Sequence, residues 1–347
     1  MTTLPDDMLA LVQKKDGFAK IESTGPYLDD LAPYLTATRQ PLPEIGPGQV
    51  LIRLRLAAIN PSDIHFIKGE YGIPRVKGAA AGFEGCGDVV ATGPGAEALE
   101  GRRVAFIGSK TGTGAWAEYV RAEAASCVPL PDIIRDEDAA GLFVNPLTAI
   151  GMVSLAAEAG TGAIVMTAGG SQLSKLMIGL AKDRGIKTIP LVRRDAMLAP
   201  LAALGADHPL NVTAPDFAER FADVSKQEKP RILLDAVADD VTAQVFFGMP
   251  NRTRWVVYGK LNPMPVAMTE MGQFVFTGKR IEGFWLTQWL EEVDSDTRKQ
   301  AFGTLFERFG SGAWRTDLQA VIPLAEAHAR LPEELMRENT GKVMFAP

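Results

Sequence analysis

The sequence predicts an α/β protein that combines a β-rich, barrel-like domain with a doubly wound parallel sheet. Three observations support this fold class. The chain has 347 residues, more than a single hydrophobic core usually holds. Roughly the first 130 residues carry short β-like runs separated by Gly and Pro. From about Asp136 onward, apolar strands alternate with helical segments, as in a parallel sheet.

Composition narrows the possible functions. Hydrophobic residues make up 46% of the chain and charged residues 22%, which is ordinary for a soluble globular protein. A net charge of −6 argues against nucleic acid as the main partner. No apolar run approaches the roughly 20 residues that cross a bilayer. The N-terminal residues are acidic where a signal peptide is basic, so we expect a cytoplasmic location. With neither nucleic acid nor a membrane as partner, we expect a small-molecule substrate.

The few cysteines and histidines limit metal and disulfide chemistry. Only Cys86 and Cys127 occur, so no disulfide framework and no Cys-rich metal knuckle can form. With three histidines in the whole chain, a structural zinc site is excluded as well.

The first domain is expected to be a compact antiparallel barrel. Its first clear strand is Gln49–Ile59, entered through the turn cluster Pro43–Gly48. Further strands are predicted at Gly87–Thr92, Arg103–Ile107 and Ala117–Val120.

The second part begins with an apolar helical region, Asp136–Ala157, interrupted at Asn145-Pro146. Alternating strands and helices follow, which predicts a doubly wound sheet. The six predicted strands are Ala163–Met166, Thr188–Val192, Asp207–Leu210, Ile232–Asp235, Trp255–Tyr258 and Ile281–Phe284. A charged amphipathic helix, Asp294–Phe309, and a last strand, Gly341–Phe345, are expected to return to the first domain.

Residues 163–195 predict a nucleotide-binding βαβ unit. An apolar strand enters the small-residue turn Thr167–Ser171, a helical stripe follows, and Gly185 fits the helix end. Such a turn presents backbone N–H groups and a helix N-terminus to a pyrophosphate. The second strand ends in Arg193 and Arg194, and arginine at this place accommodates a 2′-phosphate. The predicted cofactor is therefore NADPH.

The glycine signature of this turn is incomplete. The dinucleotide fingerprint has three spaced glycines, but here only Gly169 and Gly170 precede Ser171, Gln172, Leu173 and Ser174. An ordinary strand–turn–helix is the alternative for the turn. A solvated basic strand end is the alternative for the arginines.

Several motifs, in order, resemble the medium-chain dehydrogenase/reductase superfamily. They are Asn60–Ile64, Lys68–Gly72, Gly82–Gly87, Asn145–Ala149 and Leu204–Asp207. The resemblance covers essentially the whole chain. It implies a GroES-like catalytic domain formed by residues 1–135 and 289–347, with a Rossmann NADPH-binding domain of residues 136–288 inserted.

The zinc-dependent members of this superfamily have a cysteine where this chain has Asn60, and a His-Glu pair where it has Phe83-Glu84. A catalytic zinc ion needs three Cys, His or carboxylate ligands, and Glu84 alone cannot supply them. The resemblance therefore implies a zinc-free reductase with no metal site. His65 is expected to be a structural or surface residue.

A closer resemblance is to the mitochondrial-type trans-2-enoyl-thioester reductases. Lys68–Gly72, Tyr258-Gly259 and Gly283–Trp289 carry it. It implies that Val192–Asp195 binds the 2′-phosphate. Together with the turn, it assigns these residues to the cofactor: Asn145, Thr148, Gly169, Gly170, Ser171, Gln172, Leu173, Arg193, Arg194, Tyr258, Gly259, Phe284 and Lys342. A plain helix break is the alternative for Asn145-Pro146, and a solvent-facing strand end is the alternative for Lys342. Departures from the group at 74–81, 170–174 and Lys260-Leu261 leave the substrate open.

The candidate catalytic residues are Tyr71, Asn60 and Trp285. A zinc-free reductase must hold the developing enolate with N–H or O–H donors. The Tyr71 phenol is protonated at neutral pH and can donate, and the resemblance puts it beside the nicotinamide. Asn60 could orient Tyr71 or the carboxamide, and Trp285 could line the pocket. The alternatives are a turn residue for Tyr71, a cap of the turn Asn60–Asp63 for Asn60, and a core residue for Trp285.

The leading functional hypothesis is NADPH-dependent reduction of an activated C=C bond in an enoyl thioester or enone. The first alternative is an NADPH:quinone oxidoreductase of the same fold, which needs no dedicated proton donor. The second is a catalytically silent NADPH-binding sensor, which the incomplete glycine turn favours. A homodimer is expected from the family, with Gln273–Phe276 as a candidate edge strand. Asp235 and Asp239 are expected to cap the element after the fourth strand.

Overall fold

The chain folds into two compact units. The computed structural model describes residues 4–20, 24–108, 114–338 and 340–347. The first unit contains Met1–Val144 and Arg315–Pro347, and the second contains Asn145–Trp314. The N-terminal and C-terminal parts of the chain therefore form one unit, and the second unit is inserted between them.

The unit boundaries lie further along the chain than the sequence suggests. The sequence predicts divisions after residues 135 and 288, whereas the structure divides the chain after Val144 and Trp314. The later second boundary follows from packing. Arg308 forms an ion pair with Asp183, and the indole of Trp314 donates to the carbonyl of Leu176 at 3.1 Å. These contacts keep the charged helix before residue 314 in the second unit.

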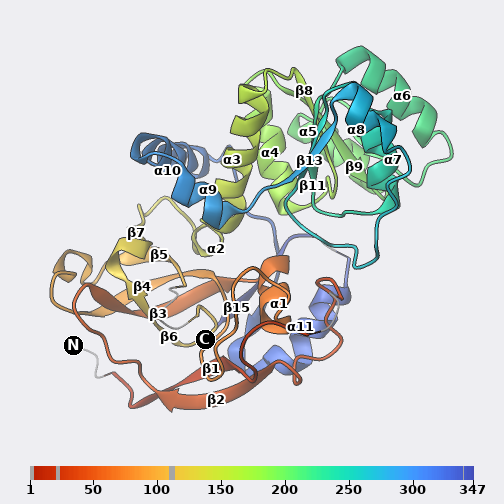
Figure 1. The fold of residues 1–347 in the computed structure, drawn as a ribbon. Coiled ribbons are helices and arrows are strands. Elements are labelled where there is room, and N and C mark those ends of the chain that lie inside the picture. The colour runs from red at the N-terminus through yellow and green to blue at the C-terminus, as the bar shows by residue number, and fades with distance from the viewer. Residues whose placement is uncertain (1–3, 21–23, 109–113, 339) are drawn as a thin grey trace. The chain divides into compact units, whose positions relative to one another are not determined.

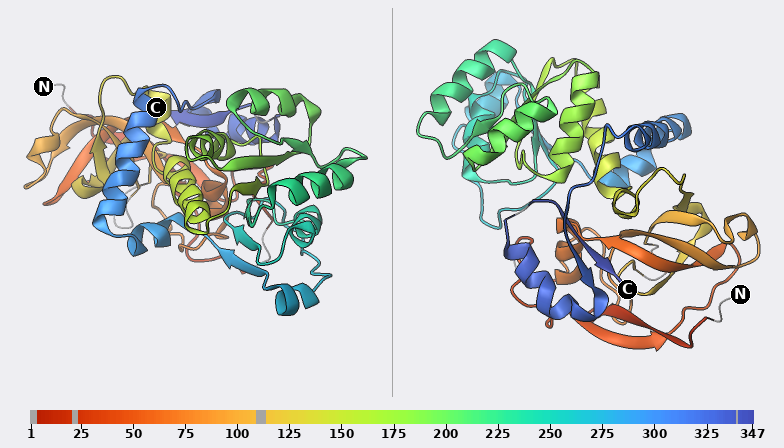
Figure 2. Two further views of the ribbon diagram at one scale, coloured as in Figure 1. Left: turned by 90° about the horizontal axis from the view of Figure 1, so that it is seen from above. Right: turned by 180° about the vertical axis from the view of Figure 1, so that it is seen from behind.

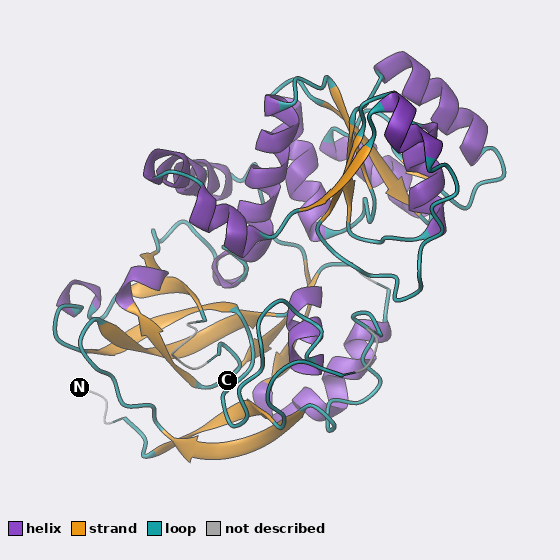
Figure 3. Ribbon diagram, viewed as in Figure 1, coloured by secondary structure: helices purple, strands orange, loops and turns teal. Residues whose placement is uncertain are grey.

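Two sheets form the first unit (Figure 3). A small antiparallel sheet pairs β1 with β2, and a seven-stranded sheet has the order β14-β15-β3-β4-β5-β7, with β6 also paired to β3. The strands are β1 (Asp7–Gln13), β2 (Leu35–Pro41), β3 (Gln49–Ala58), β4 (Glu84–Thr92), β5 (Arg103–Ile107), β6 (Tyr119–Glu123), β7 (Cys127–Pro129), β14 (Leu318–Pro323) and β15 (Lys342–Ala346). The helices are α1 (Pro61–Lys68), α2 (Asp136–Ala140) and α11 (Ala327–Met336).

An apolar core holds these strands together. Trp116, Phe106 and Phe345 are fully buried in it, and the rings of Trp116 and Phe345 meet edge to face at 5.1 Å. Ile52 of β3 also lies in this core. Because residues from both chain ends share one core, the C-terminal segment is an integral part of the first unit.

The second unit is a doubly wound parallel sheet, which confirms the predicted fold class (Figure 1). Its strand order is β10-β9-β8-β11-β12-β13, and every pairing is parallel. The strands are β8 (Ala163–Met166), β9 (Lys187–Val192), β10 (Leu210–Asn211), β11 (Ile232–Asp235), β12 (Arg254–Val257) and β13 (Arg280–Gly283). The order reverses between β8 and β11. In this fold, ligands bind at the carboxyl ends of the strands beside that reversal.

Helices cover both faces of the parallel sheet (Figure 2). They are α3 (Val144–Glu158), α4 (Gln172–Asp183), α5 (Leu198–Leu204), α6 (Phe217–Glu228), α7 (Asp240–Gly248), α8 (Gly272–Thr277), α9 (Leu286–Glu292) and α10 (Ser295–Gly310). Apolar residues of α6, α7 and α8 pack with β8, β9, β11 and β12 in one cluster. β8 and β11 are buried at every position, as expected of central parallel strands.

Several predicted elements are corrected. The apolar segment Gln273–Phe276 is not an edge strand but lies in helix α8, and β13 is the edge. The strand predicted at Asp207–Leu210 begins at Leu210, because Asp207 accepts a hydrogen bond from the Thr188 amide at 2.9 Å. The helix break falls before Val144, not at Asn145-Pro146, since proline is tolerated in the first helical turn.

One strand begins later than the sequence predicts, and one helix has the predicted position. The strand predicted at Ala117–Val120 begins at Tyr119, where pairing with β3 starts. The helix predicted at Asp294–Phe309 is confirmed as α10, with Asp294 as its N-cap. Among the described residues, no helix combines the length and the apolar character needed to cross a bilayer.

Candidate functional site

A buried carboxylate, that of Asp235, lies where the strand order of the second unit reverses. Leu234 pairs with Met166, so the residues after them, Asp235 and Thr167, leave neighbouring strands at the same level. The Thr167 hydroxyl donates to Asp235 Oδ1 at 2.6 Å, and the Trp255 indole donates to Asp235 Oδ2 at 2.9 Å. The amides of Val237 and Ala238 donate to the same carboxylate. Burial raises the pKa of Asp235, and the four donors oppose that rise.

These bonds fix the carboxyl ends of three strands, β8, β11 and β12. Asp239 caps α7 by accepting from the Thr242 amide at 2.8 Å. The capping role expected for Asp235 and Asp239 is therefore present. Asp235 does more than cap, because it joins the strands on either side of the reversal.

The turn after β8 leaves no room for a side chain at its two glycines. A Cβ atom on Gly169 would lie 2.7 Å from Pro190 Cβ, and one on Gly170 would lie 2.9 Å from Met197 Cε. Ser171 is the N-cap of α4, where its side chain accepts from the Ser174 amide at 3.2 Å. The serine in the incomplete glycine signature is thus the N-cap of α4.

Other predicted cofactor residues surround this turn. Gln172 and the buried Leu173 form the first turn of α4. Arg193 and Arg194 follow β9, and both side chains are exposed. A cationic pair next to a helix N-terminus fits a phosphate-bearing nucleotide.

Tyr258 and Gly259 follow β12. The Tyr258 amide donates to the Asp235 carbonyl at 2.9 Å. A Cβ on Gly259 would lie 3.1 Å from the Ala236 carbonyl oxygen. The Tyr258 hydroxyl is buried next to the Ser174 side chain, at the start of α4. Tyr258 therefore lies beside the turn after β8.

The remaining predicted residues of the second unit lie on α3 and beside α9. Asn145 and the buried Thr148 are in the first turns of α3. Phe284 packs on Trp289 with ring centroids 6.4 Å apart. Trp285 is the N-cap residue of α9 and is 36% exposed, so it is not a core residue.

In the first unit, Asn60 lies in a buried chain of polar side chains. The Lys342 ammonium donates to Asn60 Oδ1 and to the Ile59 carbonyl. Asn60 Nδ2 donates to Glu84 Oε1 at 2.9 Å. Glu84 Oε2 accepts from the amide of Phe143 at 2.9 Å. Burial raises the pKa of Glu84 and lowers that of Lys342.

Asp63 supports the same region from the start of α1. Its carboxylate accepts from the amides of Asn60 at 2.8 Å and Phe83 at 2.9 Å. Burial raises the pKa of Asp63 to about 7. Asn60 is therefore both the N-cap residue of α1 and a member of the buried polar chain.

Tyr71 follows α1 on an anchored segment. Its half-buried ring packs on Phe83, with centroids 5.1 Å apart. The Lys68 ammonium donates to the Thr24 hydroxyl at 2.9 Å and to the carbonyls of Gly25 and Tyr27.

His65 lies 3.2 Å from Glu70, at the end of α1 that precedes Tyr71. Gly69 ends the helix with a φ of 81°, and a Cβ there would lie 2.5 Å from Arg75 Cζ. Arg75 is buried and donates to the carbonyls of Gly17, Ile67 and Lys68. Hydrogen bonds of Lys68, before Tyr71, and of Arg75, after it, therefore anchor the segment that carries Tyr71.

Two family models match the chain. Residues 46–132 match the alcohol dehydrogenase GroES-like domain, and residues 173–305 match the zinc-binding dehydrogenase domain. The crystal structure of a "putative NADPH:quinone reductase" from Mesorhizobium loti is 49% identical over the full length of both chains, with a TM-score of 0.93. The chain belongs to the medium-chain dehydrogenase/reductase superfamily.

More distant relatives of this superfamily show similar coverage. A mitochondrial enoyl-[acyl-carrier-protein] reductase of Bos taurus is 29% identical over 294 residues, which is 82% of this chain and 77% of that protein. A quinone oxidoreductase of Pseudomonas syringae has a TM-score of 0.79 at 23% identity. It covers 98% of this chain and all of its own, and it shows the shared fold.

The donor set of this superfamily member does not fit a catalytic zinc ion. A catalytic zinc ion needs several anionic or imidazole ligands. The buried chain of polar side chains instead offers the carboxylate of Glu84, the amide of Asn60 and the ammonium of Lys342. The amide and the carboxylate are already bonded to each other, and a cationic side chain is adjacent. Within the described ranges, no cluster of three or more His, Cys, Asp or Glu residues could hold a metal.

The structure brings Asn60 and Lys342 together, although the sequence assigns them to different roles. It also shows Asp63 and Glu84 as members of one buried cluster, which sequence reasoning misses. A signal for Asp63 exists, because Asn60, Pro61 and Asp63 form the start of a capped helix. No local signal marks the partners of Glu84, which lie 24 to 60 residues away along the chain.

Proposed function

We propose that the protein is an NADPH-dependent reductase of an activated C=C bond, with a 2-enoyl thioester or an enone as substrate. Its membership of an NADPH-dependent oxidoreductase group rests on the 49% identity to the Mesorhizobium loti protein over the full chain. The choice of reaction rests on one observation. The polar chain of Asn60, Glu84 and Lys342 takes the place of metal ligands, so a hydroxyl or N–H donor must stabilise the enolate.

The second unit supplies the residues that would hold NADPH. The turn Gly169–Ser171 and the N-terminus of α4 would bind the pyrophosphate, with Tyr258 beside them. Arg193 and Arg194 would bind the 2′-phosphate. Asn145, Thr148 and Phe284 would contact the nicotinamide end, and Lys342 of the first unit is a further cofactor residue. When bound, NADPH supplies the hydride that reaches the β-carbon of the substrate.

Tyr71 has the role of proton donor or enolate stabiliser. Its hydroxyl would hydrogen-bond the enolate oxygen as negative charge develops, or protonate the α-carbon, after which solvent returns the proton. Packing on Phe83 and the anchored segment around it restrict the orientation of the ring. Asn60 would orient the reacting groups, and Trp285 would line the substrate pocket. The net reaction adds one hydride and one proton across the C=C bond.

A quinone oxidoreductase is the second candidate, and the description of the Mesorhizobium loti relative favours it. The test follows NADPH absorbance at one enzyme concentration with crotonyl-CoA, a longer enoyl-CoA, an enone and a quinone. Preferred turnover of an enoyl-CoA or enone supports the proposal. Turnover of the quinone alone identifies the second candidate. Tight NADPH binding without turnover of any acceptor would identify a silent sensor.

We also propose that two copies associate through the edge of the parallel sheet. Among the residues that the structure describes, β13 pairs only with β12, so its other edge offers free backbone groups. Exposed apolar side chains lie on it and on α8, including Ile281 at 41% and Phe276 at 86% exposure. A second copy would pair with this edge in a two-fold arrangement. The expected cytoplasmic location stays a prediction, which cell fractionation tests.

A further inference from the structure

We infer that Glu84 and Asp138 are positioning residues that fix the two segments by which the chain passes between its two units, and so limit the flexibility of these segments. The turnover part of this inference rests on the proposed function. Both residues are nearly fully buried, yet neither belongs to the predicted catalytic or cofactor-binding set.

The first crossing is held by Glu84. The first unit ends at Val144, where α3 begins. Glu84 Oε2 accepts from the amides of Phe143 and Val144, each at 2.9 Å. These are amides that a helix start leaves without intrahelical partners. A single buried carboxylate oxygen therefore holds the last two residues before the second unit.

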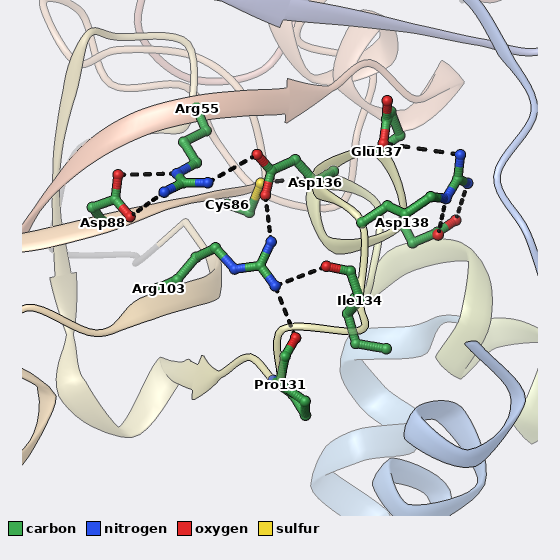
Figure 4. Close-up of polar contacts among 10 residues, drawn as sticks. Arg55, Cys86, Asp88, Arg103, Pro131, Ile134, Asp136, Glu137 and Asp138 are labelled. Carbon is green, nitrogen blue, oxygen red and sulfur yellow. Dashed lines mark hydrogen bonds and ion pairs between the residues drawn. The ribbon is translucent and has the colours of Figure 1, made fainter. Parts of the chain in front are cut away.

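The second crossing is held by Asp138. The second unit ends at Trp314, and two residues later the Thr316 amide donates to Asp138 Oδ1 at 2.7 Å. Arg135 binds Asp138 through two hydrogen bonds, at 2.7 and 2.8 Å, and donates to the Thr316 carbonyl at 3.3 Å. Figure 4 labels Asp138, whose carboxylate accepts these two hydrogen bonds. Each crossing thus ends on a carboxylate of the first unit.

Hydrogen-bond chemistry requires an acceptor at Glu84. The Lys342 ammonium can only donate, so it sets Asn60 Oδ1 toward itself and Asn60 Nδ2 toward Glu84. The two crossing amides can also only donate. Glu84 therefore faces three N–H groups, and its two carboxyl oxygens accept from all of them. A glutamine would place an NH₂ group against a donor whichever way Asn60 is turned.

A neighbouring carboxylate provides a matched control. Asp136 lies on α2 with Asp138 and binds Arg55 at 3.1 Å and Arg103 at 2.7 Å (Figure 4). Its side chain forms these ion pairs with two arginines of the first unit. Asp136→Asn removes a charge of the same kind without touching Phe143, Val144 or Thr316.

The experiment measures the spread of distances between spin labels on the two units. Labels would be placed at exposed positions by Lys15→Cys and Lys226→Cys. Both native cysteines are buried, and burial raises their thiol pKa values, so they resist labelling. The holoenzyme with NADPH is used in each case. Label distances do not depend on the substrate, so a failure of the proposed function leaves this test intact.

Glu84→Gln and Asp138→Asn should each broaden the distance distribution, and Asp136→Asn should not. Turnover should fall by about tenfold or more in each variant, and the NADPH Kd should stay unchanged in Asp138→Asn, whose bonding partners are not among the cofactor residues. Val144→Pro is the second variant, because proline suits the first helical position and deletes one donor without disturbing a buried charge. Val144→Ala is its control. Unchanged distributions in Glu84→Gln and Val144→Pro, or broadened ones with full turnover, would overturn the inference.

Discussion

Replacing Asp235 by asparagine tests the frame of the proposed nucleotide site. The carboxylate accepts on Oδ1 from the Thr167 hydroxyl and the Val237 amide, and on Oδ2 from the Trp255 indole and the Ala238 amide. Asparagine keeps one acceptor oxygen and puts an NH₂ group in place of the other. In the orientation that preserves the Thr167 bond, the Trp255 indole then faces a donor, while the Ala238 amide keeps its second, longer bond to Oδ1 at 3.2 Å.

The expected cost follows from the unpaired indole. A buried donor without a partner costs about 1–3 kcal/mol. Removing a buried charge offsets part of this, since burial already raises the pKa of Asp235. We therefore expect the free energy of unfolding of the second unit to fall by about 1–2 kcal/mol. NADPH binding should weaken as well, because the ends of β8, β11 and β12 lose their common acceptor.

Urea unfolding followed by tryptophan fluorescence measures this loss. Of the five tryptophans only Trp116 lies in the first unit, so the signal reports mainly on the second. Trp255→Phe is the partner variant, since it keeps an aromatic ring and deletes one donor. The double variant should lose less than the sum of the single losses, because both changes affect one hydrogen bond. A change of less than about 0.5 kcal/mol in Asp235→Asn would refute the reasoning.

Three further predictions concern the cofactor, pH and assembly. Arg193→Ala combined with Arg194→Ala should weaken NADPH binding by about 10–100-fold and leave NADH binding nearly unchanged, as titration would show. Asp63 has a pKa of about 7 against 3.8 unfolded, so it stabilises the fold fully below about pH 4 and ceases to do so as pH rises through about 7. Asp63→Asn should therefore flatten the decline in Tm between about pH 4 and pH 7, and parallel curves would contradict this. Ile281→Lys should convert a dimer into a monomer by light scattering, and an unchanged mass would exclude the β13 edge as the contact.

Buried runs are the part of the fold that the sequence specifies best. Ala163–Met166, Ile232–Asp235 and Arg103–Ile107 were each predicted with the observed bounds. Such runs are set by local composition, because central strands bury both faces. Gln273–Phe276 misleads for the same reason, since a short apolar run does not distinguish strand from helix.

Long-range pairing explains what the sequence leaves undetermined. β1 and β2 pair across more than 20 intervening residues, and neither carries a clear alternating pattern. The candidate site likewise contains features with a local sequence signal and features that depend on distant partners. The turn at Gly169–Ser171 follows from local spacing, whereas the bond from Thr316 to Asp138 joins residues 178 positions apart. No local rule predicts such a partner.

The measurement that tests the central claim most directly is the turnover of Tyr71→Phe with crotonyl-CoA and NADPH. The change removes one hydroxyl and keeps the ring that packs on Phe83. Tyr27→Phe, at a tyrosine that is 62% exposed, is the control. We predict that kcat falls by about 100-fold or more in Tyr71→Phe, with an unchanged NADPH Kd and a fully active control. Full enoyl-CoA turnover in Tyr71→Phe would contradict the account.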